Sequence, residues 1–145
     1  MNKELEEYTK EDENIIKSFD VKDKLSEAFF DKNQKMHEDV RKKLLDISNN
    51  FIEFLGIEFF IHDIILTGSL SNYMWSNYSD VDLHILVDFE NNKYGLDILK
   101  EFFAAKKSSW NNTHNIKINN FEVEIYVQDV DEKHTASGIY SILKN

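Results

Sequence analysis

The chain contains no cysteine, which excludes disulfide bonds and zinc sites built on thiolates. No apolar run reaches the ~20 residues that a membrane-spanning helix needs, and the first residues are acidic, unlike a secretory signal. We therefore expect no membrane partner and a soluble, cytoplasmic protein. Proline is also absent, and Arg41 is the only arginine among 17 basic residues. We interpret this composition as the coding bias of an AT-rich bacterial or phage genome, and not as a functional signal.

Basic residues are scarce relative to acidic ones, 17 against 27, and the formal net charge is −10. A protein that binds duplex nucleic acid needs a basic surface, so the charge disfavours that class of partner. An acidic chain is compatible with a metal site. The length of 145 residues predicts one domain, and a hydrophobic content of 41% supplies its core.

The spacing of apolar residues divides the chain into predicted helices and strands. We expect a charged lead-in over residues 1–20, which is a mobile segment or the start of a solvated helix, and one domain over residues 21–145. The predicted helices span residues 21–30, 32–55 and 94–110, and the predicted strands span residues 59–67, 81–89, 116–118, 121–127 and 139–142. Gly56 is placed to end the second helix, and Asn119-Asn120 to turn a hairpin. This order predicts an α/β or α+β fold, a sheet of four or five strands with helices packed on one side.

A glycine-serine turn and a pair of aspartates follow one another closely in the sequence. Gly68 has no Cβ and can bring the backbone close to a phosphate, and Ser69 adds a hydroxyl donor. Ten residues later, Asp80 and Asp82 stand at alternate positions at the start of a strand, so both carboxylates point to one face. Carboxylate oxygens are the ligands that Mg²⁺ and Mn²⁺ prefer, and the pair predicts a site for phosphoryl or nucleotidyl transfer.

A third carboxylate is expected from the strand at residues 121–127. Two-metal transfer usually needs one more acidic group, which bridges the ions or activates the attacking hydroxyl. Glu122 and Glu124 alternate with apolar residues on this strand, so both face the same way. Either glutamate fits the role, and the choice between them stays open.

The complete pattern resembles the DNA polymerase β-like nucleotidyltransferase superfamily, and is most similar to its small single-domain members, the minimal bacterial and phage-encoded ones. It spans about residues 61–129 and reads Thr67-Gly68-Ser69, ten residues, Asp80-Val81-Asp82-Leu83, and later Val123-Glu124-Ile125. The resemblance implies a mixed sheet with helices on one face. It also implies transfer of a nucleoside monophosphate from an NTP, with ATP favoured, to an acceptor hydroxyl while pyrophosphate leaves.

The resemblance also implies roles for individual residues. Gly68, Ser69 and Ser79 would hold the triphosphate. Two Mg²⁺ or Mn²⁺ ions would be held by Asp80, Asp82 and Glu124, which are the expected catalytic residues. Many members carry aspartate at the third position, where this chain has glutamate.

The sequence departs from the larger members, which append a helical domain that holds the base and the acceptor. Sixteen residues follow Asp129. Base and acceptor would therefore contact the N-terminal helices, the loop from Ser71 to Tyr78, or a partner. The loop carries three aromatic residues, which either stack on a base or pack against the sheet; the sequence does not distinguish the two.

The expected substrate is an NTP, and the acceptor is a partner protein or a small molecule, with nucleic acid less favoured. The alternative is a catalytically silent module of the same fold that binds a nucleotide or a partner, and a metal-dependent phosphohydrolase is a third reading. The apolar stripe of residues 32–55 is interpreted as core, unless the chain forms a homodimer through it. We interpret His84 as a satisfied polar residue at the edge of the site, and Asp88 as a solvated strand end.

Overall fold

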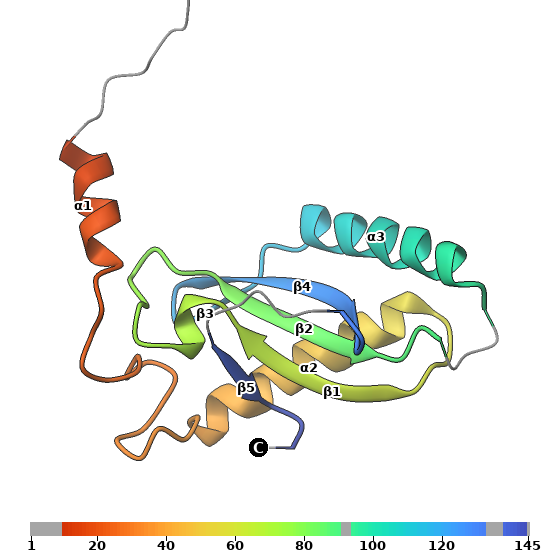
Figure 1. Cartoon of the computed structure of the whole chain (residues 1–145), viewed down its shortest axis with the longest axis horizontal. Helices are drawn as coiled ribbons and strands as arrows, with labels where there is room; N and C mark the ends of the chain where they lie inside the picture. The colour runs from red at the N-terminus through yellow and green to blue at the C-terminus, as the bar shows by residue number, and fades with distance from the viewer. Residues whose placement is uncertain (1–9, 91–93, 133–137, 145) are drawn as a thin grey trace, which may run out of the picture.

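The computed structural model describes residues 10–90, 94–132 and 138–144 of the chain. Three α-helices, one short 3-10 helix and five strands follow one another along these residues (Figure 1). Their bounds are α1 (Lys10–Ser18), α2 (Glu38–Leu55), β1 (Ile61–Thr67), η1 (Ser69–Ser71), β2 (Val81–Val87), α3 (Leu96–Thr113), β3 (Lys117–Ile118), β4 (Phe121–Asp129) and β5 (Ile139–Ser141).

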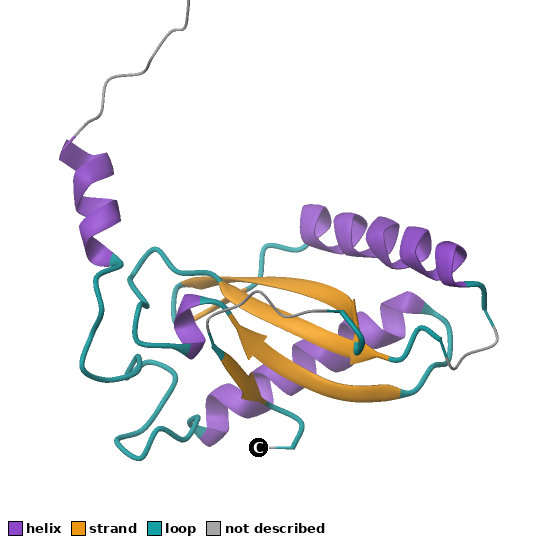
Figure 2. Cartoon of the chain, in the orientation of Figure 1, coloured by secondary structure: helices purple, strands orange, loops and turns teal. Residues whose placement is uncertain are grey.

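The five strands form one mixed sheet in the order β3-β4-β2-β1-β5. The central pair, β2 and β4, is parallel, and the other three pairs are antiparallel. Helices α2 and α3 pack against the same core, so one layer of helices covers one face of the sheet (Figure 2). The α+β fold with a mixed sheet of four or five strands is confirmed.

Alternation along the strands decides which face meets the helices. Val81, Leu83 and Ile85 of β2 are buried and lie in register with Val123, Ile125 and Val127 of β4. The intervening residues of both strands point to the opposite face. On the helix side, the ring of Phe51 from α2 meets Trp110 from α3 edge to face, with centroids 5.4 Å apart. This aromatic contact joins the two helices above the sheet.

The predicted hairpin turn at Asn119-Asn120 and the predicted helix end at Gly56 are confirmed. Asn119 and Asn120 have φ of 50° and 71°, the left-handed pair that a two-residue hairpin requires between β3 and β4. Gly56 takes φ 72° as the C-cap of α2.

Where β4 extends beyond the short strand β3, the side chain of Asn111 from α3 pairs with its backbone. The Asn111 amide donates to the carbonyl of Ile125 (3.2 Å) and accepts from the N–H of Ile125 (3.3 Å).

The predicted helix over residues 21–30 is wrong. This segment forms turns instead, because contacts with a distant loop hold it: Lys22 N–H donates to the Tyr73 carbonyl at 2.7 Å, and Trp75 Nε1 donates to the Lys24 carbonyl at 2.9 Å. The next helix begins at Glu38 and not at residue 32, since residues 30 and 36 form a β-bridge ahead of it.

The predicted lead-in falls partly outside the described residues, which begin at Lys10. From there α1 runs to Ser18, buries none of its residues and extends away from the sheet (Figure 1). In the part of the chain that the structure describes, no helix is long and apolar enough to cross a membrane.

Replacing Phe51, whose ring contacts Trp110 of α3, tests how the two helices pack together. Phe51 is 0% exposed, so Phe51→Ala leaves a cavity and is expected to lower the free energy of unfolding by about 3–5 kcal/mol. Phe60→Ala is the matched control, because Phe60 is 77% exposed, and its effect should stay within about 0.5 kcal/mol. Urea denaturation followed by circular dichroism measures both; equal losses would contradict this core.

Candidate functional site

The glycine turn after β1 lies directly against one of the two aspartates. Gly68 has φ +79°, and a Cβ built on it would stand 2.5 Å from Oδ2 of Asp82. Only glycine therefore allows both the left-handed turn and the close approach of the Asp82 carboxylate. The turn and the start of β2 form one local unit.

The two serines of the predicted phosphate site meet each other. Ser69 at the start of η1 and Ser79 just before β2 place their hydroxyl oxygens 2.6 Å apart. Ser79 Oγ also accepts a hydrogen bond from the N–H of Ser76 at 2.9 Å, and Ser79 is buried. These bonds close the loop between β1 and β2 at its base, next to Gly68.

The parallel register brings acidic residues from two strands into one row. Asp82 of β2 lies beside Glu124 of β4 on one side and Thr67 of β1 on the other. Asp80 immediately precedes β2 and is exposed on the same face. Glu122, the competing candidate, is exposed and lies opposite Lys117 of β3.

Burial, and then the charges of nearby carboxylates, raise the pKa values of the two aspartates. Burial raises the pKa of Asp82 to about 6, and the charges of Asp80 and Glu124 add to the shift. Burial also raises the pKa of Asp80, with contributions from the charges of Glu124 and Glu122. Mutual repulsion of this kind is relieved when a cation binds among the groups.

Two ring side chains, Tyr126 and His84, lie on the same face as the acidic residues, and Tyr126 contacts one of them. The hydroxyl of Tyr126 donates a hydrogen bond to Glu124 Oε2. The pKa of Tyr126 lies well above its ordinary value, because burial and this hydrogen bond both disfavour the phenolate. His84 sits one row along; its Nδ1 is 2.6 Å from Oε1 of Gln128, and its ring lies 4.9 Å from that of Tyr126. The interpretation of His84 as a satisfied polar residue agrees with these contacts.

A second acidic cluster lies at the other end of the same strands. Asp88, Asp129 and Asp131 place carboxylate oxygens within 4.8 Å of one another, and they could hold a metal ion. No other three acidic or histidine side chains converge as closely among residues 10–90, 94–132 and 138–144. The reading of Asp88 as a solvated strand end is therefore corrected, because it is half-buried in this cluster.

This second cluster forms only because β2 and β4 pair in parallel, a register that the sequence does not show directly. Val87, the last residue of β2, lies beside Asp129, so Asp88 ends one strand where Asp129 ends the other. The alternate spacing of Asp129 and Asp131 was the available signal. In contrast, the oxygens of Asp80, Asp82 and Glu124 do not converge to the same degree, since Asp82 turns toward Gly68 and Glu124 toward Tyr126.

The loop from Ser71 to Tyr78 uses two of its three aromatic residues to contact the N-terminal segment. Tyr73 Oη accepts a hydrogen bond from Gln34 at 2.6 Å, and Trp75 donates to the Lys24 carbonyl. These contacts favour packing over base stacking for both rings. Tyr78, the third aromatic residue of the loop, is exposed, so base stacking and packing against the sheet both stay open for it.

Comparison with known proteins identifies no relative of this chain. No protein-family model, curated protein or solved structure matches this chain. The resemblance to nucleotidyltransferases therefore depends on the residues of the pattern, and what stands independently of it is an α+β fold with a cluster of aspartates that could hold a metal.

Adding a methyl group to the turn tests the contact between Gly68 and Asp82. Gly68→Ala combines a positive φ with a clash against a carboxylate, so we expect a loss in unfolding free energy of more than about 1 kcal/mol. Gly95→Ala is the control, because its Cβ would meet nothing closer than 3.8 Å. The control should change stability by less than about 0.5 kcal/mol. A tolerated Gly68→Ala in denaturant titrations would contradict the close approach.

The raised pKa of Asp82 predicts a pH dependence of stability in metal-free protein. The folded state keeps a proton on Asp82 up to pH about 6, whereas the unfolded chain releases it near 3.8. The stabilising contribution is therefore present below pH 4 and lost as the pH rises to 6. The difference in unfolding free energy between wild type and Asp82→Asn should therefore shift against wild type between pH 4 and 6. Above pH 6 this difference should no longer change with pH. Both proteins are measured in EDTA.

Proposed function

We propose that the protein is a metal-dependent nucleotidyltransferase, which moves a nucleoside monophosphate from an NTP to an acceptor hydroxyl. One observation carries the proposal: the Asp82 carboxylate touches the Gly68 turn and lies beside Glu124 in the sheet. A place for phosphates and a group of carboxylates are thereby adjacent, as this chemistry requires.

The donor set fits divalent cations. Asp80, Asp82 and Glu124 offer carboxylate oxygens from two adjacent strands, and their charges repel one another in the absence of a counterion. Mg²⁺ or Mn²⁺, two ions in the full scheme, would be held by these three residues and would neutralise charge on the reacting phosphates. The register favours Glu124 over Glu122 as the third carboxylate, because Glu124 lies directly beside Asp82.

The turn supplies contacts to the triphosphate. Main-chain N–H groups at Gly68 and Ser69 are the proposed donors, since glycine leaves the backbone accessible. The hydroxyl of Ser69 is already held by Ser79 at 2.6 Å. In this scheme Ser79 orients Ser69 and is itself too buried to be the first contact with a phosphate.

The acceptor oxygen attacks the α-phosphorus of the NTP, the bond from that phosphorus to the β-phosphate oxygen breaks, and pyrophosphate leaves. Glu124 takes the proton of the acceptor hydroxyl. The hydroxyl of Tyr126 keeps its own proton and positions the Glu124 carboxylate through the hydrogen bond that it donates.

The acceptor is proposed to be a protein side chain or a small molecule, with ATP as the favoured donor. The net charge of −10 would repel a nucleic-acid acceptor, and the exposed Asp80 stands at the entrance to the site.

Label transfer in a lysate tests the proposal. Purified protein is incubated with each α-³²P-labelled NTP and Mg²⁺ or Mn²⁺, and we expect label on one acceptor species. Asp80→Asn/Asp82→Asn should reduce transfer by at least about a hundredfold, because both carboxylates are needed in the same step. The matched control is Asp39→Asn/Asp46→Asn, two exposed aspartates of α2, which should retain activity.

Three outcomes would count against transfer at this site. Label lost in Asp129→Asn/Asp131→Asn but retained in Asp80→Asn/Asp82→Asn would move the reaction to the second cluster. Release of free nucleoside monophosphate without a labelled acceptor would indicate a hydrolase. Nucleotide binding without any turnover would support the silent binding module.

A further inference from the structure

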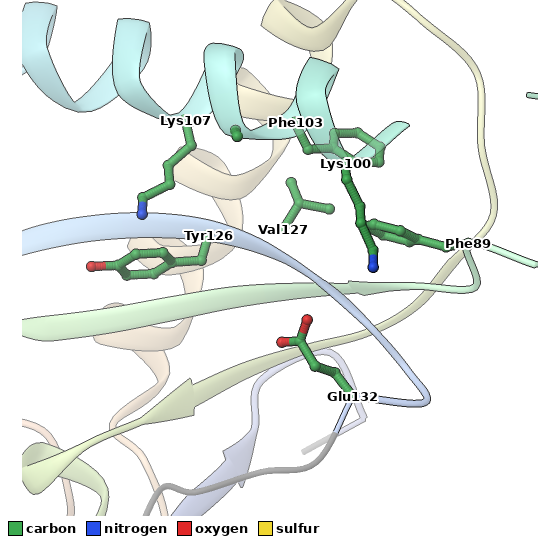
Figure 3. Close-up of a pocket in the computed structure, with 8 residues that line it drawn as sticks. Phe89, Lys100, Phe103, Lys107, Tyr126, Val127 and Glu132 are labelled. Carbon is green, nitrogen blue, oxygen red and sulfur yellow. The ribbon is translucent and has the colours of Figure 1, made fainter. Parts of the chain in front are cut away.

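A groove of about 340 Å³ lies between α3 and strand β4 (Figure 3). One end of it borders the second acidic cluster, because Phe89 and Glu132, which line it, both donate backbone hydrogen bonds to Asp129. Lys100, Phe103 and Lys107 line it from α3, and Tyr126 from β4. Phe89 and Glu132 close the end beyond the strands. This volume is in the range of small-molecule sites in proteins.

The groove gathers positive charge in an acidic protein. Lys100 and Lys107 are seven residues apart on α3, which is about two helical turns and ~10 Å, so both side chains project from the same face. Neither lysine forms an ion pair with any described residue. Figure 3 shows both ammonium groups directed toward the strand side of the groove. In a chain with a net charge of −10, these two lysines make the α3 wall of the groove positive, while Glu132 keeps a negative charge at the end beyond the strands.

Three aromatic side chains and one carboxylate, which accepts hydrogen bonds, also line the groove. The ammonium of Lys107 lies 4.2 Å from the centre of the Tyr126 ring, and the rings of Phe89 and Phe103 are 5.3 Å apart. Such surfaces suit a flat or apolar part of a ligand. Glu132 offers carboxylate oxygens at the other wall, which accept hydrogen bonds from hydroxyl or amino groups.

We propose that this groove binds a phosphorylated small molecule of nucleotide size that also carries hydroxyl or amino groups. The phosphate sits between Lys100 and Lys107, whose long stems allow both ammonium groups to turn toward it. The ring or sugar lies on the aromatic wall, and its donors face Glu132. The inference is independent of whether Asp80, Asp82 and Glu124 are catalytic.

Tyr126 connects the groove with the acidic site. Its ring forms part of the groove, while its hydroxyl donates to Glu124. A ligand seated on the ring therefore contacts the residue that positions the Glu124 carboxylate, so occupancy of the groove is sensed at the proposed centre.

Titration in EDTA tests the groove separately from the acidic site. Without cations, the carboxylates of Asp80, Asp82 and Glu124 repel phosphate, so only the lysine groove should retain it. AMP, inorganic phosphate and adenosine are the probes, followed by amide chemical shifts. We expect AMP to bind more tightly than phosphate, adenosine not to bind at the same concentrations, and the shifts to centre on α3 and Tyr126.

Matched variants decide the outcome. Lys100→Gln/Lys107→Gln should weaken AMP binding by about tenfold or more, because two charge-assisted contacts are lost. Lys42→Gln/Lys43→Gln, an exposed pair on α2, should leave the affinity unchanged.

Four results would overturn the proposal. They are no binding of AMP in EDTA, equal affinity in Lys100→Gln/Lys107→Gln, shifts centred on the Gly68 turn, and displacement of AMP by a short acidic peptide at lower concentration than by phosphate. The last result would assign the groove to an acidic protein segment. A failure of label transfer together with lysine-dependent AMP binding would refute the proposed enzyme and leave this site standing.

Discussion

The parallel pairing of β2 with β4 is the constraint on which the rest of the structure depends. Because side chains alternate between faces, this single register places Val81, Leu83 and Ile85 against the helices and Asp82 beside Glu124 on the other face. A slip by one residue would bury the carboxylates and expose the core. Packing energy therefore fixes the position of the acidic residues, although they contribute nothing favourable to it.

The two acidic groups share this strand pair and stand at opposite ends of it. Asp82 and Asp88 are six residues apart on an extended strand, or about 20 Å. At the Asp82 end, burial and neighbouring charges disfavour the ionised carboxylate. At the other end, Asp88, Asp129 and Asp131 bring their oxygens together. The apolar face thus stabilises the sheet, while the burial of Asp82 at one end opposes folding when its carboxylate is ionised. This division is common where binding groups are imposed on a packed scaffold.

Local signals were sufficient for most elements, and non-local contacts account for the errors. The hairpin at Asn119-Asn120, the cap at Gly56 and the strands followed from turn residues and apolar spacing. Residues 21–37 did not, because contacts with Tyr73 and Trp75 about fifty positions away override their helical spacing. In the site, the closeness of the Gly68 turn to the strand that carries Asp82 could be expected from their spacing in the sequence. The cluster around Asp129 required a register between strands forty residues apart, which no local pattern contains.

The bonds between Asn111 and Ile125 have a consequence for how the protein behaves at high concentration. An exposed strand margin invites pairing with another chain, and sheets that offer one tend to associate. Here a helix side chain supplies both the donor and the acceptor that a neighbouring strand would have brought. The β4 side of the sheet is therefore already closed in the monomer at this residue, and chain-to-chain growth of the sheet would have to start elsewhere.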